Sequence, residues 1–377
     1  MTTNLTNSTN KVPNVPPLRF PEFTGEWEKS TLGGIADIVG GGTPETDRKE
    51  YWNGEIIWYT PSEIGKNKYS SDSERHITQE GLDNSSAKLL PSGTILLSTR
   101  ATIGESSIAL NKCTTNQGFQ SLIAQRGIYH EFLYYLIATK KHELVKRACG
   151  STFLEISANE VRKVPVLVPL FKEQYKLSTF LGLIDQRIET QNKIIQHLES
   201  LIKGISKMLL TKQGNTFIKD CLVCNSSTLQ ESSVLPCGKY PVYGATGISG
   251  YLDVPQVEHD AILIIKDGAG VGNVRYATDK YGVIGTLNYL SAKNGYNLKY
   301  LYYCLRIFNF TPFVTGLAIP HIYFRDYGTA KIYCPSLIEQ KHIANNLSNI
   351  ERKIEVEKQL LEELKEQKKY LLSQMFI

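Results

Sequence analysis

The sequence predicts an α+β protein: two pseudo-repeated mixed α/β domains joined by two long helices that form an antiparallel coiled coil. Three observations predict this class. The motif Pro-x-x-x-Glu-Gln occurs at Pro169–Gln174 and again at Pro335–Gln340, 166 residues later. A heptad pattern of apolar residues follows each motif, and a tyrosine pair precedes each one. The expected parts are a flexible N-terminal arm (1–18), a first domain (19–168), a first long helix (169–212), a second domain (213–334) and a second long helix (335–377).

The two long segments have the spacing of a coiled-coil seam. Their apolar residues alternate at intervals of four and three, which is the period of helices that wrap around one another. Such a stripe must be buried, and the nearest available partner of each helix is the other copy. We expect the seam to contain Leu181, Ile184, Ile188, Ile195, Leu198 and Ile202 of the first helix and Leu347, Ile350, Ile354, Leu361 and Leu364 of the second.

An antiparallel pairing is favoured because the intervening domain lets the chain return to its starting point. Each helix of about 40 residues would then be roughly 60 Å long. Gln191 and Glu357 occupy the same position in the two copies, so they would lie in adjacent central layers. A polar pair there would fix the register at some cost in stability. The alternative is two separate helices, each packed on its own domain.

The repeat extends more loosely into the two domains. Ile95–Gly104 resembles Leu263–Gly272, and Gly150–Ile156 resembles Gly316–Ile322. Each domain has one helix with the tyrosine pair, around 129–146 and 298–308, and the pairs Tyr134–Tyr135 and Tyr302–Tyr303 are expected to pack inside. The first domain has the longer insertion, at 44–90. Short β-rich runs separated by Gly, Pro and Asn are predicted at 55–59, 94–98, 261–266 and 283–290.

Composition excludes several classes of protein. Hydrophobic residues make up 41% and charged residues 21%, which is ordinary for a globular chain and unlike a disordered one. No apolar stretch approaches the ~20 residues of a membrane span, and residues 1–18 lack the apolar core of a signal peptide. With seven scattered cysteines, a disulfide framework is not indicated, and a cytoplasmic location is expected. The net charge of +5 permits a nucleic-acid partner without indicating one.

The motifs of common catalysts are missing from the sequence. It has no GxxxxGK[ST] phosphate loop, and its single Pro-Pro pair, Pro16-Pro17, lacks the neighbours of an adenine methyltransferase motif. Gly268–Gly272 fits a glycine-rich hairpin better than a dinucleotide loop, because a second strand is predicted after it. Cys221, Cys224 and Cys237 lack a second cysteine pair or paired histidines, so no metal site is predicted.

On these features the chain resembles the specificity subunits of type I restriction–modification systems. The resemblance covers the chain from Pro17 onward and rests first on the duplicated Pro-x-x-x-Glu-Gln helices. The other supporting segments are Trp27–Gly33, Leu97–Gly104, Pro241–Tyr251 and the segments that begin at Gly150 and Gly316.

The resemblance implies a non-catalytic subunit whose two domains each read one half of a bipartite site in double-stranded DNA. The helix pair would set the distance between half-sites and dock two modification subunits. This chain would bind no cofactor itself. The modification subunits would carry S-adenosylmethionine and methylate adenine, and restriction subunits would supply the ATP- and Mg-dependent translocase and the nuclease. No membrane partner is implied.

Candidate DNA contacts are polar and basic residues on predicted loops, since such side chains reach base edges and phosphates. Arg100 and Asp267 fall near equivalent positions but differ in charge, as expected if the two domains read different sequences. For each candidate the alternative is a solvated charge or a tyrosine packed on a strand. The candidates are Lys66, Asn67, Lys68, Tyr69, Arg100, Thr102, Ser151 and Thr152 in the first domain and Tyr243, Lys266, Arg275, Tyr323 and Arg325 in the second.

Two other functions remain open at this point. A coiled-coil adaptor that binds only proteins would show no sequence-dependent binding to DNA. A stand-alone nucleic-acid enzyme with an unrecognised active site would methylate or cleave DNA without partners.

Overall fold

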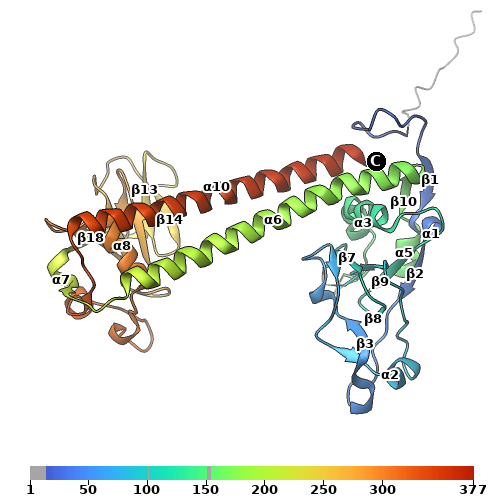
Figure 1. The fold of residues 1–377 in the computed structure, drawn as a ribbon, viewed down its shortest axis with the longest axis horizontal. Helices are drawn as coiled ribbons and strands as arrows, with labels where there is room; N and C mark the ends of the chain where they lie inside the picture. The colour runs from blue at the N-terminus through green and yellow to red at the C-terminus, as the bar shows by residue number, and fades with distance from the viewer. Residues whose placement is uncertain (1–13, 101, 151–153) are drawn as a thin grey trace, which may run out of the picture. The chain divides into compact units, whose positions relative to one another are not determined.

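The computed structural model describes residues 14–100, 102–150 and 154–377. The chain divides into two compact units. Unit 1 contains the described residues up to Thr190 together with Glu362–Ile377, and unit 2 contains Gln191–Leu361. Each unit holds one domain and a segment of both long helices, α6 (Phe171–Leu210) and α10 (Leu337–Met375) (Figure 1).

Unit 1 is built on three sheets. The five-stranded sheet has the order β2 (Ala36–Gly40), β9 (Gln120–Ala124), β6 (Ile95–Leu97), β7 (Ser106–Ala109) and β4 (Tyr69–Ser70). The three-stranded sheet has the order β5 (His76–Ile77), β3 (Trp52–Tyr59) and β8 (Cys113–Thr115), and β1 (Glu28–Thr31) pairs antiparallel with β10 (Pro165–Val168). The short helices are α1 (Leu32–Ile35), α2 (Gln79–Asp83), α3 (His130–Thr139), α4 (Lys141–Lys146) and α5 (Ala158–Arg162).

Unit 2 also contains three sheets. The four-stranded sheet has the order β12 (Leu222–Ser226), β18 (Leu287–Ala292), β15 (Ala261–Ile265) and β16 (Val274–Ala277). The three-stranded sheet has the order β14 (Gly247–Leu252), β13 (Tyr240–Gly244) and β17 (Gly282–Val283), and β11 (Thr216–Phe217) pairs antiparallel with β19 (Lys331–Ile332). The short helices are α7 (Ile218–Cys221), α8 (Leu298–Ile307) and α9 (Phe324–Tyr327).

The two domains share one core strand topology, to which unit 1 adds β4. The order β2-β9-β6-β7 in unit 1 corresponds to β12-β18-β15-β16 in unit 2. The pairs β3 with β8 and β13 with β17 are both parallel, and both domains close with a short antiparallel pair before the long helix. The predicted duplication of mixed domains is therefore confirmed, and it is more complete in the strand order than in the sequence.

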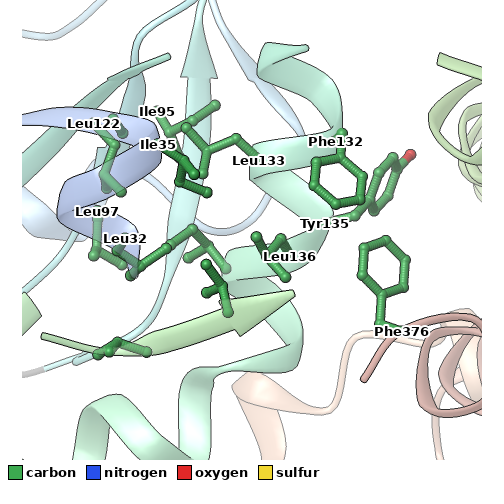
Figure 2. Packing of buried hydrophobic residues seen from close by; sticks show 14 of the residues in the cluster. Leu32, Ile35, Ile95, Leu97, Leu122, Phe132, Leu133, Tyr135, Leu136 and Phe376 are labelled. Carbon is green, nitrogen blue, oxygen red and sulfur yellow. The ribbon is translucent and has the colours of Figure 1, made fainter. Parts of the chain in front are cut away.

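The main core of unit 1 lies between the central sheet, α3 and the long helices. Figure 2 shows the apolar side of α3, with Phe132, Leu133 and Leu136, facing residues of the sheet and Phe376. The Phe376 ring stacks on Phe132 with 5.5 Å between centroids and lies edge-on to Trp27. Replacing a buried phenylalanine by alanine costs about 3–5 kcal/mol, so the end of α10 is a substantial part of this core.

The long helices pair in both units as an antiparallel coiled coil. In unit 1 the beginning of α6, through Leu177 and Leu181, shares a core with Leu371 near the end of α10. In unit 2 the later part of α6, through Ile202, shares a core with Leu347 near the beginning of α10. All eleven predicted seam residues are buried or half-buried, which confirms the seam and excludes two helices packed only on their own domains.

Three expectations about local structure are corrected. Residues 14–18 do not belong to a loose arm, because Leu18 N donates to Gln374 O over 2.9 Å and Pro16 is buried. The helix expected over 129–146 is divided at Lys140 into α3 and α4. The strand expected over 283–290 is interrupted between β17 and β18, where Gly285 N donates to Leu229 O instead of continuing a ladder.

No helix in the described part of the chain is long and apolar enough to cross a membrane. Within the same residues, no three His, Cys, Asp or Glu side chains are placed to hold a metal ion. Cys221 is buried whereas Cys237 is exposed, and both are free thiols. Gly268–Gly272 forms the turn of the hairpin between β15 and β16, as the sequence predicted.

Candidate nucleic-acid interface

A closed loop follows helix α8 in unit 2 and is attached to the end of strand β15. Thr315 and His321 exchange two main-chain hydrogen bonds, of 2.9 and 2.8 Å, at the base of the loop. Gly268 N donates to Pro320 O over 2.8 Å. Ile322 N donates to Lys266 O over 2.9 Å. These bonds fix the loop against the residues that follow the central strand.

This arrangement brings together three of the residues predicted to contact DNA. Lys266 lies at the end of β15, half-buried and in contact with the Asp267 carboxylate. Tyr323 follows the closed loop, and the Arg325 guanidinium lies 4.7 Å from the centre of its ring. The side chain of Arg325 is 79% exposed and its nearest carboxylate, on Asp326, is 3.6 Å away. Arg325 is therefore the cation of this group that can reach furthest into solvent.

Tyr243 and Arg275 form a second group in unit 2. Arg275 Nη2 donates to Ala245 O over 3.0 Å and Nη1 donates to Gly244 O over 3.4 Å, so the guanidinium supports the turn between β13 and β14. Tyr243 is half-buried and packs edge-on against Tyr281, with 5.6 Å between ring centroids. Both residues therefore have structural contacts near this turn.

The corresponding loop of unit 1 has the same closure with different charges. Cys149 and Glu155 exchange main-chain hydrogen bonds of 2.9 and 3.0 Å. The main chain of Arg100 forms an isolated β-bridge with Glu155, as that of Asp267 does with His321. The Arg100 side chain also forms an ion pair with Glu155 over 2.9 Å. Arg100 and Asp267 are thus equivalent, as the sequence predicted. Thr102 is exposed beside this bridge, whereas Ser151 and Thr152 lie outside the described residues.

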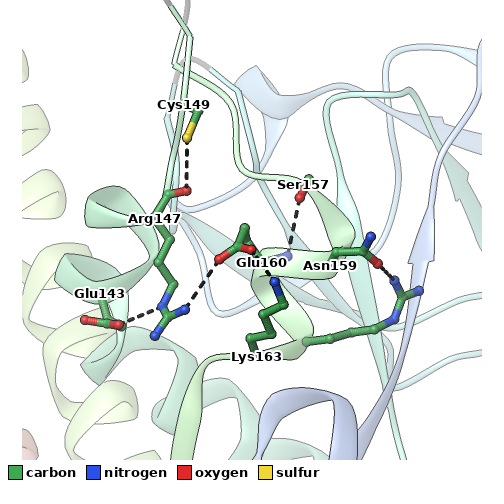
Figure 3. A network of polar contacts seen from close by, with 8 residues as sticks. Glu143, Arg147, Cys149, Ser157, Asn159, Glu160 and Lys163 are labelled. Atoms are coloured by element: carbon green, nitrogen blue, oxygen red, sulfur yellow. Dashed lines mark hydrogen bonds and ion pairs between the residues drawn. The ribbon is translucent and has the colours of Figure 1, made fainter.

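A network of ion pairs connects the residues on either side of this loop. Figure 3 shows Arg147, just before Cys149, between two glutamates: its Nε lies 2.6 Å from Glu143 and its Nη1 lies 3.4 Å from Glu160. Lys163 adds an ion pair of 2.8 Å to the same Glu160 carboxylate. The network joins α4 to α5, so the two ends of the loop are held by neighbouring helices.

Residues 66–69 include two exposed side chains and two that form hydrogen bonds within the unit. Lys66 and Asn67 are exposed on the loop before β4. Lys68 points inward: its side chain is only 10% exposed, and Nζ donates to Glu131 over 2.9 Å and to Tyr135 Oη over 3.1 Å. The Tyr69 hydroxyl donates to the other oxygen of Glu131 over 2.6 Å. We therefore leave Lys68 out of the proposed contacts, because its ammonium is used inside the unit.

The charge state of Glu131 follows from these contacts. Burial opposes ionisation of this carboxyl, but the hydrogen bonds from Tyr69 and Lys68 and the positive charge of Lys68 outweigh it, so the pKa of Glu131 is lowered. Glu131 is an ionised acceptor that ties the loop to α3.

The same duplicated architecture is found in known proteins. The model of the family described as "Type I restriction modification DNA specificity domain" matches this chain twice, over residues 24–200 and 217–366. The chain belongs to this family. Each match covers one domain and most of the long helix that follows it, so the repeat of the specificity family corresponds to the repeat in the sequence.

Individual relatives agree with this assignment. The chain is 39% identical over 186 residues to the type I restriction enzyme MjaIX specificity subunit of Methanocaldococcus jannaschii, covering 48% of this chain but only 43% of that protein. It is 23% identical over 348 residues to the type I restriction enzyme EcoprrI specificity subunit of Escherichia coli, covering 85% of this chain and 86% of that protein. The match to the first relative therefore spans less than half of its length.

Solved structures show the same fold. The S subunit of a type I restriction–modification system from M. genitalium matches with a TM-score of 0.62 and 19% identity, over 96% of this chain and 99% of that one. A chain from a study of complex assembly and conformational transition of the type I R-M system matches with a TM-score of 0.61 and 16% identity, over 94% of this chain and 98% of that one.

The duplicated motif Pro-x-x-x-Glu-Gln has a structural role that the sequence did not reveal. In unit 1 the Gln174 side chain is 1% exposed and accepts a hydrogen bond from Tyr129 N, at the start of α3, over 2.9 Å. Its Nε2 donates to Pro169 O over 2.9 Å and to Gly127 O over 3.2 Å. The glutamine therefore fastens the beginning of α3 to the beginning of α6.

Unit 2 repeats this contact with its own glutamine. Gln340 is also 1% exposed, its Oε1 accepts from Asn297 N over 2.9 Å, and its Nε2 donates to Pro335 O over 2.9 Å. The glutamate before it behaves differently in the two units. Glu173 is buried and accepts two hydrogen bonds of 2.7 Å from Arg19, whereas Glu339 is exposed.

The second tyrosine of each pair also contacts the long helix. Both pairs pack against their domain cores, as predicted, with Tyr135 and Tyr303 almost fully buried. Tyr135 Oη donates to Asp185 Oδ2 of α6 over 2.5 Å, and Tyr303 Oη donates to Glu351 Oε2 of α10 over 2.6 Å. The sequence did contain a signal for these partners, because Asp185 and Glu351 are 166 residues apart and both acidic.

An apolar groove lies on the outer side of the first turns of α6. Its volume is about 630 Å³. Phe171, Tyr175 and Leu183, spaced along one side of the helix, are each at least half exposed. The equivalent positions in α10 are Leu337, Lys341 and Asn349, so the groove is a feature of the first copy. Its lining residues are Phe20, Phe171, Lys172, Tyr175, Lys176, Thr179, Phe180 and Leu183.

Proposed function

We propose that this chain is the DNA-recognition subunit of a type I restriction–modification complex and that each unit reads one half of a bipartite, asymmetric site. The observation that carries the proposal is that one topology occurs twice with different side chains at equivalent loop positions. Arg100 and Glu155 in unit 1 are replaced by Asp267 and His321 in unit 2. Two identical readers would favour a symmetric site, whereas two different readers favour an asymmetric one.

The proposed contacts divide by chemistry. Exposed cations hold phosphates and orient the domain, and polar side chains that reach a groove distinguish bases. Arg325 is placed for the first role because it is the most exposed cation of its group. Thr102 and Asn67 suit the second, because hydroxyl and amide groups pair with base edges. The set proposed is Lys66, Asn67, Tyr69, Arg100, Thr102, Ser151, Thr152, Tyr243, Lys266, Arg275, Tyr323 and Arg325.

In this proposal the paired long helices keep the two readers at a set interval on DNA. Half-sites one turn apart are separated by roughly 34 Å along the duplex. A helix of 40 residues has a length of roughly 60 Å, so it can cover that interval with its ends inside the domains.

The partners in this proposal supply the chemistry. Two modification subunits dock on the helix pair, carry S-adenosylmethionine and methylate adenine, and restriction subunits contribute ATP- and Mg-dependent cleavage. The apolar groove on α6 supports docking of a modification subunit, because exposed aromatic and aliphatic side chains in one contiguous patch are typical of protein interfaces. The complex would act in the cytoplasm, where its DNA substrate lies.

Methylation mapping tests the proposal. The chain and its modification subunit would be expressed in a host without other adenine methyltransferases, and methylated adenines would be located by sequencing. We expect a gapped motif with two different half-sites, and no motif when the modification subunit is expressed alone. An ungapped or palindromic motif, or methylation that does not depend on this chain, would contradict the proposal. Binding to the partner without any effect on DNA would favour a protein adaptor.

A further inference from the structure

Each unit attaches its short domain helix to a long helix at two polar points. The first point is the motif glutamine, which accepts a hydrogen bond from the main chain at the start of the domain helix. The second is a carboxylate that accepts from the tyrosine hydroxyl. In both units the two donors are six residues apart and the two acceptors eleven. The pairs are Tyr129–Gln174 and Tyr135–Asp185 in unit 1, and Asn297–Gln340 and Tyr303–Glu351 in unit 2.

Two polar contacts fix the angle between the domain helix and the long helix, which apolar packing alone leaves free. Hydrophobic contact is roughly proportional to area and has no preferred direction, so a helix packed only by leucines can rock with little loss. A hydrogen bond is directional and weakens steeply when it bends. The Tyr135 and Tyr303 side chains are almost fully buried, so neither hydroxyl can readily exchange its carboxylate for water.

Further ion pairs hold each carboxylate in place. In unit 1, Lys368 of α10 lies 2.6 Å from the other oxygen of Asp185, so the attachment spans both long helices. In unit 2, Arg306 contacts Glu351, and Ser348 Oγ lies 3.1 Å from Tyr303 Oη. The two units therefore use different supporting residues around the same pair of tyrosine and carboxylate.

In unit 1 the attachment continues to a predicted recognition loop. Lys68 Nζ bonds both Tyr135 Oη and Glu131, and Glu131 accepts from the Tyr69 hydroxyl. A continuous path of hydrogen bonds thus runs from the loop at 66–69 through α3 to Asp185 of α6. Rocking of α3 on the long helix would move this loop.

We propose that the pairs Tyr135–Asp185 and Tyr303–Glu351 set how strictly the protein measures the gap between its half-sites. This inference rests on the proposed function. The two tyrosines act as positioning residues: they contact no DNA, but they hold each reading domain at one angle to its helix. A change of one base pair in the gap moves a half-site by roughly 3.4 Å and rotates it by about 35° around the duplex axis. A domain held at a fixed angle to its long helix cannot reach the displaced half-site, whereas a domain that can change this angle compensates for part of the displacement.

The test uses the complete complex with modification subunits. The DNA probes are duplexes that carry the mapped bipartite site with its natural gap and with the gap lengthened or shortened by one base pair. The variants are Tyr135→Phe and Tyr303→Phe, which keep the ring and remove only the hydroxyl. Tyr134→Phe is the matched control, because Tyr134 is the neighbouring tyrosine of the same helix and takes no part in the attachment.

We expect the wild-type complex to bind the natural gap most tightly. Each positioning variant should lower the ratio of affinities between natural and altered gaps by about tenfold, the scale of one hydrogen bond to a charged group. Discrimination against a single base change inside either half-site should stay as in the wild type. The control should match the wild type in both respects.

The outcomes separate the inference from the function on which it rests. Variants that keep the wild-type gap ratio would overturn the inference. So would variants that lose discrimination inside the half-sites by the same factor, because the tyrosines would then only stabilise their domains. A wild-type complex that binds all gaps and sequences equally would overturn the proposed function and this inference together.

Discussion

Gln191 of α6 donates through Nε2 to the main-chain oxygen of Glu357 in α10 over 3.0 Å, and it also contacts the Glu357 carboxylate. The two residues occupy the same position in the two copies and are among the few buried polar side chains of the seam. In an antiparallel register shifted by one heptad, both would face leucine or isoleucine. The pair therefore specifies one antiparallel register.

Removing one partner of this pair should destabilise the protein more than removing both. We expect Gln191→Leu to lower the free energy of unfolding by about 1 kcal/mol, the scale of a lost hydrogen bond, because Glu357 keeps its ion pair with Lys353 but loses the amide donor. Gln191→Leu with Glu357→Leu should recover that loss or exceed the wild-type stability, since an apolar layer replaces a polar one. Urea unfolding measures both, and the exposed Gln196→Leu serves as the control. A double variant less stable than the single one would argue against this account.

Lengthening the helix pair should widen the gap in the DNA site. One heptad inserted after Thr190 and another after Leu361 keep the seam in phase and add about 10 Å to each helix. At roughly 3.4 Å per base pair, the methylated motif should acquire about three additional base pairs between unchanged half-sites. Methylation sequencing reads the result, with a heptad in one helix alone as the mismatched control. An unchanged gap would show that the helices do not determine the spacing.

Arg325 should contribute to affinity through charge. If it holds a phosphate, Arg325→Ala weakens binding to specific and random DNA alike and reduces the slope of log affinity against log salt by about 0.9. Arg352→Ala removes an exposed cation from α10, outside the loops, and is the charge-matched control. Binding isotherms at several salt concentrations supply the measurement. Loss of preference at one base pair, with the salt slope intact, would instead assign Arg325 to base reading.

Unit 1 should lose stability at acid pH through Glu131. Its pKa is lowered in the folded protein, so its contribution is fully present above the pKa of the unfolded chain, about 4.3, and is lost as the pH falls through the lower folded value. Melting temperature followed between pH 6 and pH 3 should fall less steeply in Glu131→Gln than in the wild type. Glu74→Gln, an exposed substitution in the same domain, should retain the wild-type slope.

The long helices illustrate what could be predicted from sequence. Heptad spacing is a local pattern that a helix converts directly into a buried stripe, so Leu181, Ile202 and Leu364 could be assigned without coordinates. The loop candidates were less predictable. Lys68 and Arg100 are both basic and both precede or follow a strand, but one is used inside the unit and the other lies at a loop base. Nothing in the local sequence distinguishes them, because the difference is the position of Glu131 and Glu155.

Periodicity and the repeat of 166 residues are enough to predict the duplication, the residues of the helix seam and the inward packing of the tyrosine pairs. Which polar groups meet inside each domain depends instead on tertiary packing. The hydroxyl of Tyr135 and the carboxylate of Asp185 are 50 residues apart in the chain and 2.5 Å apart in space. Hydrogen bonds form over a few ångströms and only in narrow directions, so their partners are selected by the packing of elements that no local pattern encodes.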